Sequence, residues 1–255
     1  MLDLNAAYKV CLSIPSWLQD LKDDFYLNFI KDDRYMYIVK GLGTTLEITV
    51  FAVILGVFLG VIAAIIRSTY DKTKTDMRPG PGQALLAILN AIVKLYLTVI
   101  RGTPVVVQLM ITYYIIFASS TNQLLVAVLA FGFNSGAYVA EIIRSGIMSI
   151  DNGQFEAGRS LGFNYIQTMV YIIIPQAFKN VLPALANEFI VLIKETSVSG
   201  YVGIQDMTRG GDVIRSRTFS AFMPLLAVAL IYLLIVIFFS KLVSILERRL
   251  RNSER

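Results

Sequence analysis

The sequence predicts an all-α integral membrane protein that has five transmembrane helices and one polar projection between them. Of its 255 residues, 56% are hydrophobic and only 16% are charged, whereas soluble domains carry roughly 25% charged residues. The apolar residues form long runs, and runs of about 18 or more residues are typical of membrane-spanning helices. Basic residues gather at the ends of these runs, as they do on the cytoplasmic side of membrane proteins.

The composition also argues against several classes of function. The chain has no histidine and its single cysteine is Cys11, so we expect neither a histidine-based metal site nor an internal disulfide. It contains no GxxxxGK[ST] phosphate-binding loop, so we expect no ATP or other cofactor on this chain. The net charge of +5 lies mostly at the ends of membrane segments, which indicates topology rather than a nucleic-acid partner.

Residues 1–38 are predicted to form an extracytoplasmic or interfacial segment. Lys9 and Pro15 interrupt the apolar run near its start, and this run is too short to span a bilayer. Acidic residues slightly outnumber basic ones, and aromatic residues typical of a membrane surface recur at Trp17, Phe25 and Tyr35. The N-terminus lacks the basic-then-apolar pattern of a cleavable signal.

Residues 39–247 are predicted to form the transmembrane domain, whose first span covers 41–66. Glu47 is the only charged residue of that span. Gly56 and Gly60 are four residues apart, which either allows a neighbouring helix to approach closely or reflects the ordinary glycine content of membrane helices. The basic loop 67–82 that follows is expected on the cytoplasmic side.

Residues 83–100 admit two interpretations, because the run is long enough to span but contains Asn90 and Lys94. Another apolar run begins almost directly after Arg101 and leaves no room for a turn. We therefore expect 83–100 to lie along the cytoplasmic interface as an amphipathic helix. The second span is then 104–118.

The rest of the domain is predicted to cross the membrane three more times. Polar residues 119–123 form a turn, and the later spans are 124–143, 177–195 and 221–243, with a glycine-rich polar stretch at 196–220. The tail 248–255 is basic and therefore cytoplasmic. Five crossings place the N-terminus outside and the C-terminus inside, so that the basic loop, Arg144, Arg159 and the tail share one side.

The projection is the polar, glycine-punctuated stretch 151–176, which lies between two spans on the predicted cytoplasmic side. Its pattern predicts a short helix from Gln154 to Leu161, a left-handed stop at Gly162 and a second helix from about Asn164. Pro175 is expected to break that second helix. A small rigid unit of this kind is suited to contact a partner.

The projection resembles the EAA loop of ABC-transporter permeases, in which Glu-Ala-Ala is followed by a glycine and an isoleucine-rich run. The matching residues are Glu156-Ala157-Gly158, Gly162 and the Ile-Ile-Ile-Pro of 172–175. Glycine replaces the third small residue, and because glycine costs about 1 kcal/mol relative to alanine in a helix, we expect a softer helix. Stretches at 101–114, 136–150, 160–167 and 175–198 also resemble permeases for polar amino acid uptake, of the histidine/arginine/glutamine type.

The resemblance implies a permease subunit of an ATP-driven importer in the cell membrane of a prokaryote, and not an enzyme. Such a permease works with a second permease copy (homodimer or heterodimer), with cytoplasmic ABC ATPase subunits that bind ATP and Mg, and with an extracytoplasmic amino-acid-binding protein. The residues implied to dock on the ATPase are Gln154, Phe155, Glu156, Ala157, Gly158, Arg159, Leu161 and Gly162. Independently of docking, Glu156 suits the positive end of the helix dipole.

Carboxylates within predicted spans are expensive to bury and therefore indicate functional sites. Glu188 has no basic residue three or four positions away and lies about 16 Å along its span, close to mid-bilayer. We expect Glu188 to bind substrate, with Asn187 beside it. Glu141 is expected to pair with Arg144 on its own helix, whereas Glu47 fits a structural and a binding role equally well.

Three further residues are candidates for the substrate pocket. Asn134 and Ser135 lie near the middle of a span and either bind substrate or join helices by hydrogen bonds. Tyr114 either lines the pathway or anchors the second span at the membrane surface.

The chemistry of these residues bears on the cargo and on the class of transporter. A carboxylate pocket favours basic amino acids such as arginine, lysine or histidine, although a permease for glutamine or another small solute also needs polar groups. The alternative from a different class is an ATP-independent channel or secondary carrier. Carriers often show inverted internal repeats, and the sequence shows no clear repeat.

Overall fold

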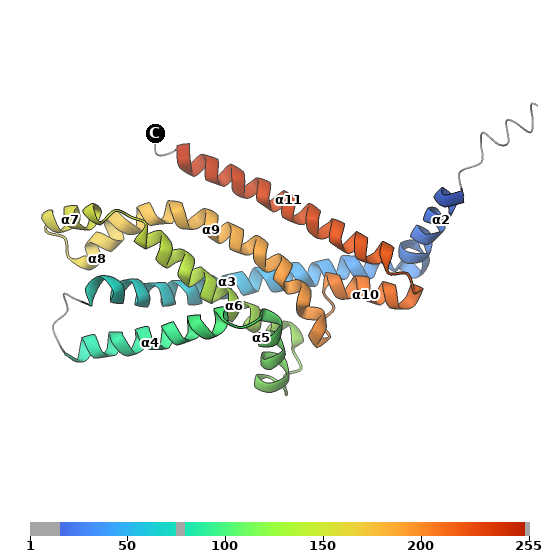
Figure 1. The fold of residues 1–255 in the computed structure, drawn as a ribbon, viewed down its shortest axis with the longest axis horizontal. Helices are drawn as coiled ribbons and strands as arrows, with labels where there is room; N and C mark the ends of the chain where they lie inside the picture. The colour runs from blue at the N-terminus through green and yellow to red at the C-terminus, as the bar shows by residue number, and fades with distance from the viewer. Residues whose placement is uncertain (1–15, 75–79, 253–255) are drawn as a thin grey trace, which may run out of the picture.

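The computed structural model describes residues 16–74 and 80–252, and the described residues are almost entirely helical (Figure 1). Cys11, the middle of the first loop and the last three residues lie outside them. Five described helices are long and apolar enough to cross a membrane: Tyr35–Thr73, Pro81–Arg101, Gln123–Met148, Tyr165–Val202 and Phe222–Leu250. The predicted all-α membrane class and the number of spans are therefore confirmed.

The long helices lie lengthwise in one bundle, with α7 and α8 at one end and α2 and α10 at the other (Figure 1). We call these the α7 end and the α10 end. In chain order the elements are α2 (Ser16–Phe25), η1 (Tyr26–Ile30), η2 (Lys31–Asp33), α3 (Tyr35–Thr73), α4 (Pro81–Arg101), α5 (Val105–Ile111), η3 (Thr112–Ile116), α6 (Gln123–Met148), α7 (Asn152–Ser160), α8 (Tyr165–Thr168), η4 (Met169–Ile173), α9 (Ile174–Glu195), η5 (Thr196–Val202), α10 (Met207–Thr218) and α11 (Phe222–Asn252).

Helices α3 and α6 form the centre of the bundle, and glycines allow their backbones to come close. A Cβ atom on Gly60 would lie 2.4 Å from Val139 Cγ1, and one on Gly56 would lie 2.9 Å from Ser135 Cβ. Small residues take this role in membranes because lipid supplies little hydrophobic drive for helix association. The close-approach interpretation of Gly56 and Gly60 is therefore confirmed.

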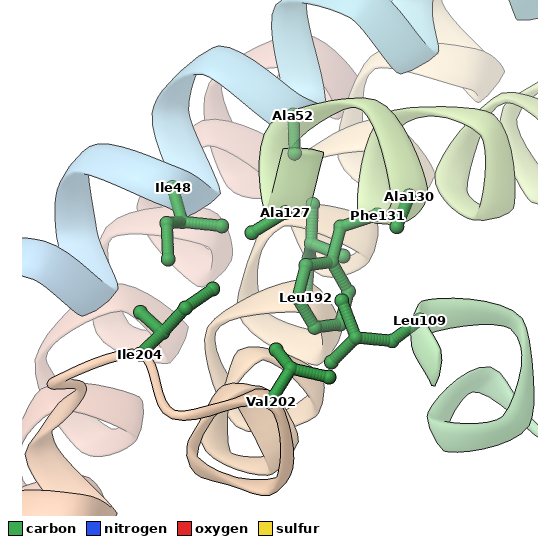
Figure 2. Packing of buried hydrophobic residues seen from close by; sticks show 9 residues of the cluster. All are labelled: Ile48, Ala52, Leu109, Ala127, Ala130, Phe131, Leu192, Val202 and Ile204. Carbon is green, nitrogen blue, oxygen red and sulfur yellow. The ribbon is translucent and has the colours of Figure 1, made fainter. Parts of the chain in front are cut away.

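One buried apolar cluster joins α3, α6 and α9 to the short helix α5. Figure 2 shows Leu109 of α5 reaching toward Phe131 of α6 and Leu192 of α9, and all three side chains are fully buried. The complete cluster is Ile48, Ala52, Leu109, Ala127, Ala130, Phe131, Leu192, Val202 and Ile204. Side-chain packing therefore holds α5 against the bundle.

The identity of the second span differs from the prediction. Helix α4 covers the run 83–100 that was expected along the interface, but it packs on α3 and α6 through Leu97 and is a candidate span. The run 104–118 that was expected to cross contains two short helices, α5 with 7 residues and η3 with 5 residues. At 1.5 Å per residue they extend about 18 Å, too short for a hydrocarbon layer of about 30 Å.

The chain bends at 102–104 instead of turning back, because one side chain satisfies carbonyl groups that the bend frees. Gln108 Nε2 donates to Ile100 O at 2.7 Å and to Thr103 O at 3.0 Å. An unsatisfied backbone group costs several kcal/mol in hydrocarbon, so irregular backbone persists there only where it finds such partners. The expectation that α4 had to lie outside the membrane for lack of a turn was therefore wrong.

The predicted side of each loop is unchanged when α4 replaces 104–118 as the second crossing. With α4 as the second crossing, the end of α3, the start of α4, the projection and the end of α11 all lie toward the α7 end (Figure 1). The basic segments would be separated only if α4 and 104–118 both crossed. Because 104–118 is too short to cross, the basic segments are still expected on one side.

Part of the N-terminal segment packs into the α10 end. Asn28 is buried, and its Oδ1 accepts a hydrogen bond from Thr218 Oγ1 at 2.8 Å. Phe29 belongs to a buried cluster with Ile38, Met207, Ile214 and Val228. Residues 28 and 29 are thus part of the helical fold, whereas an interfacial position of α2 stays a prediction.

The projection leads into α9 without a break. Pro175 was expected to break the second helix, but α8, η4 and α9 follow one another as a single helical segment. The π turn η4 explains the difference: Ile174 N donates to Met169 O, five residues back, and this wider turn directly precedes the proline. The proline has no N–H to donate, and the wider turn directly before it accommodates this missing hydrogen bond without ending the helix.

Replacing Gly60 with alanine is expected to destabilise the α3–α6 contact by about 1–3 kcal/mol, as overpacking does. The added methyl group would lie 2.4 Å from Val139 Cγ1 and 2.9 Å from the backbone nitrogen of Ala140. The midpoint of thermal unfolding in detergent should therefore fall. Gly43→Ala is the matched control, because a Cβ on Gly43 meets nothing within 4 Å. Equal midpoints for the two variants would contradict the close contact.

Candidate functional site

Helices α4, α6 and α9 line an open cavity of about 410 Å³. Its charged groups are the guanidinium of Arg101 and the carboxylates of Glu141 and Glu188. On α9, Asn180, Ala184 and Glu188 recur every four residues, so they share one helix face. The full lining is Arg101, Tyr138, Glu141, Ile142, Ser145, Gly146, Ser149, Asn180, Ala184 and Glu188.

Glu188 is buried, with 8% of its surface exposed. Ser135 Oγ donates a hydrogen bond to Glu188 Oε1 at 3.0 Å, which joins α6 to α9. Within residues 16–74 and 80–252, no lysine or arginine forms an ion pair with Glu188. Its carboxylate is therefore available for a cationic group that enters the cavity.

The structure brings only two of the predicted substrate residues together, Glu188 and Ser135. Asn134 is also buried, but its Nδ2 donates to Gln108 Oε1 at 2.9 Å, so it supports the bend after α4. Asn187 and Glu47 are exposed and do not line the cavity. Tyr114 is exposed as well, and its ring stacks edge-on with Tyr113 at 5.0 Å.

Most residues of the cavity lining were not proposed as substrate contacts from the sequence, and Tyr138, Asn180 and Arg101 are among them. Tyr138 and Asn180 are polar residues within spans, and Asn180 Nδ2 donates to Ser149 Oγ at 3.2 Å. Arg101 ends the helix that was expected at the interface, and its guanidinium lies 5.6 Å from the centre of the Tyr138 ring. Arg101 is the last residue of α4, so it becomes a candidate for the cavity only when α4 is taken as a membrane span.

The predicted pair between Glu141 and Arg144 is present. Arg144 Nη2 lies 2.7 Å from Glu141 Oε1, and its Nε lies 3.2 Å from Glu141 Oε2. Glu141 is also 3.9 Å from Arg101, and Arg144 is 3.6 Å from Asp71. The pair therefore belongs to a chain of charges that joins α3, α4 and α6.

The projection presents α7 as an exposed helix at the end of the bundle. The helix starts two residues earlier and ends one residue earlier than predicted, at Asn152–Ser160, and Asp151 Oδ1 caps it by accepting from Gly153 N at 2.6 Å. Most of the predicted docking side chains point to solvent, namely Gln154, Glu156, Ala157, Arg159 and Leu161. Beside them lies a groove of about 560 Å³ between α7, α8 and the end of α3.

Phe155 attaches α7 to the end of α3. Its side chain is half-buried, and Lys72 Nζ lies 4.3 Å from the centre of its ring. Lys72 Nζ also donates to Asn152 Oδ1 at 2.8 Å. A cation above an aromatic face is an attractive arrangement, so both contacts hold α7 against α3.

Two of the three glycines of the projection, Gly158 and Gly162, have clear structural roles. Gly162 has a φ of +80°, which confirms the predicted left-handed stop. Gly158 is buried, and a Cβ there would lie 2.7 Å from both Thr168 Cγ2 and Thr168 Oγ1. Thr168 cannot easily move away, because it is buried and its hydroxyl donates to Asn164 O at 3.0 Å. The glycine thus allows α7 to pack on α8, a role that the sequence pattern did not reveal.

No group of three or more metal-binding side chains occurs in the part of the chain that the structure describes. The cavity is lined by groups that hold small polar or charged molecules by ion pairs and hydrogen bonds. It therefore suits binding and passage of a solute.

Comparisons with known proteins identify the family. The family described as "Binding-protein-dependent transport system inner membrane component" matches residues 83–252. The chain is 36% identical over 222 residues to the arginine transport system permease protein of Bacillus subtilis, covering 86% of this chain and 94% of the relative. It is 34% identical over 220 residues to the putative glutamine transport system permease protein of Rickettsia typhi, covering 85% and 94%.

A solved structure agrees with these relatives. The crystal structure of an amino acid ABC transporter with histidines contains a chain that is 40% identical, with a TM-score of 0.74, and the match covers 87% of this chain and 98% of that chain. Because the relatives are transport permeases, the prediction of a transport subunit rather than an enzyme is confirmed. The chain belongs to the family of binding-protein-dependent transport system inner membrane components, within the group of ABC permeases that includes these amino acid transporters.

Proposed function

We propose that the chain is the permease subunit of an ATP-driven importer for polar amino acids, with a preference for basic ones. The observation that carries the proposal is Glu188, a buried carboxylate on the wall of the open cavity that α4, α6 and α9 line. Burying an unpaired carboxylate is costly, so a buried acid without a basic partner indicates a place where a cation binds. The names of the relatives, which include an arginine and a glutamine permease, support an amino acid as cargo.

The preference for basic amino acids follows from the balance of charge in the cavity. Arg101 and Glu141 lie 3.9 Å apart, so their opposite charges offset each other. The negative charge of Glu188 is then the remaining charge on the cavity wall. An arginine or lysine substrate has a cationic side chain that can meet it. Glutamine is the alternative cargo, because Ser145 and Asn180 supply hydrogen-bonding groups for a neutral side chain.

The projection is proposed to dock on a cytoplasmic ABC ATPase subunit, which binds ATP and Mg. Helix α7 offers the exposed side chains of Glu156 and Arg159, and Leu161, directly after the helix, has 72% of its surface exposed. Because α8, η4 and α9 form one helical segment, a push on the projection would be passed to the helix that carries Glu188. A rigid element moved by a partner is a common route to alternating conformations.

The remaining partners and the orientation belong to the same proposal. A second permease copy completes the membrane pathway, as a homodimer or heterodimer, and an extracytoplasmic amino-acid-binding protein delivers the cargo. The α7 end faces the cytoplasm of a prokaryotic cell because it bears Lys72, Arg159 and the basic tail. The N-terminus is then outside.

The test of this function is uptake of radiolabelled arginine and glutamine into liposomes that contain the complete complex. Uptake is expected only when ATP is enclosed in the vesicles, on the side of the membrane that carries the ATPase. Arginine is expected to be taken up more efficiently than glutamine. An ATP-independent channel or secondary carrier would transport with the permease alone. Uptake without ATPase subunits or ATP would overturn the proposal.

Glu156→Lys is expected to weaken association with the ATPase and to lower ATP-driven uptake at least fivefold, the lower limit of typical coupling between sites. The substitution reverses a charge on the exposed face of α7. Co-purification of the ATPase and uptake in liposomes measure the two effects. Glu247→Lys, the same change at an exposed position of α11, should leave both unchanged. Normal association and uptake with Glu156→Lys would exclude docking through this residue.

Glu188→Gln is expected to raise the KM for arginine about tenfold or more, because it removes a charge-assisted contact worth about 1.5–3 kcal/mol. Glutamine at this position can still accept the hydrogen bond that Ser135 donates to Glu188, so the fold should persist. The KM for glutamine uptake should change less. Equal losses for the two amino acids would assign Glu188 a structural role.

A further inference from the structure

The last turn of α3 contacts two parts of the permease with neighbouring side chains. Lys72 holds α7 through Asn152 at 2.8 Å. Asp71, one residue earlier, lies 3.6 Å from Nη1 of Arg144 on α6. Successive residues of a helix point about 100° apart, so one turn of α3 contacts the projection and α6 at the same time.

Arg144 continues this connection toward the cavity. Its Nε and Nη2 hold both carboxylate oxygens of Glu141, at 3.2 and 2.7 Å, while its Nη1 faces Asp71. The guanidinium is planar and fixed by this double contact, so a displacement of one carboxylate is passed to the other. The Asp71, Arg144 and Glu141 side chains are only 24–28% exposed, which limits screening by solvent.

The chain of charges ends on the wall of the cavity. Glu141 and Arg101 both line it, 3.9 Å apart, on the α4 and α6 side. Glu188 and Asn180 line it from α9. The projection thus reaches the cavity by two routes, along α8, η4 and α9 to Glu188, and through α3 and Arg144 to Glu141 and Arg101.

We infer that Asp71 and Arg144 are positioning residues for transport, which tie the place of α7 to the placement of Glu141 and Arg101 on the cavity wall. This inference rests on the proposed function, because α7 moves only if an ATPase drives it. Movement of α7 displaces the end of α3, and Asp71 then releases or pulls Arg144. The two walls of the cavity therefore change together, and the cargo is bound or released in step with the ATPase.

A purely bracing role for Asp71 fits the structure less well. Helices α3 and α6 are already held together by the close backbone contact at Gly56 and Gly60. One partly exposed ion pair adds little to stability. Loss of Asp71 also leaves Arg144 and Glu141 paired within α6. Its removal should therefore disconnect α3 from the cavity without unfolding the bundle.

The experiment uses the complete complex in liposomes and measures arginine uptake and ATP hydrolysis in the same preparation. Asp71→Asn is expected to lower the arginine transported per ATP at least fivefold, while the ATPase stays bound and the thermal midpoint stays unchanged. Asp71→Glu should restore most of the ratio, because it returns a carboxylate to Arg144. Asp212→Asn is the matched control, since Asp212 also bonds two arginines, Arg209 and Arg215, but on α10 and away from the cavity.

The outcomes separate this inference from the proposed function. ATP-driven uptake by the unsubstituted complex supports the proposed function, and its absence would refute that function and this inference with it. If the unsubstituted complex transports but Asp71→Asn has the same ratio of arginine to ATP, the inference alone is refuted. It is also refuted if uptake and ATP hydrolysis fall together and Asp71→Glu does not rescue them, because that pattern shows a structural brace.

Discussion

The close contact between α3 and α6 is the constraint on which the rest of the structure depends. Glycines at 56 and 60 let the two backbones approach, and this contact orients both helices over most of their length. The side chain of Ser135 on α6 faces Gly56 of α3, and its hydroxyl also donates a hydrogen bond to Glu188 of α9. The same pair of helices therefore places the cavity carboxylate and, through the end of α3, the projection.

The irregular segments of the chain persist because each has specific hydrogen-bond partners. The bend after α4 is held by Gln108, and Asn134 in turn holds Gln108. The π turn before Pro175 keeps α8 and α9 in one helical segment. These devices satisfy the requirement that backbone groups in hydrocarbon find partners within the protein. One of these departures from regular helix, the π turn, lies on the path between the projection and the cavity.

Two routes then lead from the projection to the cavity, and they end on opposite walls. The helical route runs through α9 to Glu188. The ionic route runs through Lys72, Asp71 and Arg144 to Glu141. Under the proposed function, a displacement of α7 by an ATPase would therefore reach both walls of the cavity.

Most of the fold follows from the hydropathy pattern, because a run of apolar residues of sufficient length has few alternatives to a membrane helix. The pattern failed at α4, where Asn90 and Lys94 resembled an interfacial helix although Asn90 is buried and accepts a hydrogen bond from Arg67 at 3.3 Å. A partner 23 residues away cannot be read from local periodicity. For the same reason, the local sequence pattern did not indicate that Arg101 lines the cavity.

The projection was easier to predict than the cavity. Gly162 and the start of the second helix follow from local capping rules, and both are present. Gly158 was expected to soften α7, but its role depends on Thr168, which approaches only in the folded chain. For the cavity, the depth of Glu188 along its span correctly indicated a cavity residue. Asn134, Asn187 and Glu47 do not line the cavity, because packing between helices sets the rotation of each helix and the local sequence does not show it.

If α7 passes the action of an ATPase to the cavity as proposed, α7 and α9 move as one body. The direct measurement is the distance between spin labels on Ser160→Cys of α7 and Asn187→Cys of α9, in a Cys11→Ser background within the reconstituted complex. This distance within one chain is expected to stay the same with and without ATP, while the distance between the Ser160 labels of two permease copies changes. A change of the distance between α7 and α9 within one chain would show that α7 moves independently of α9 and would refute this coupling.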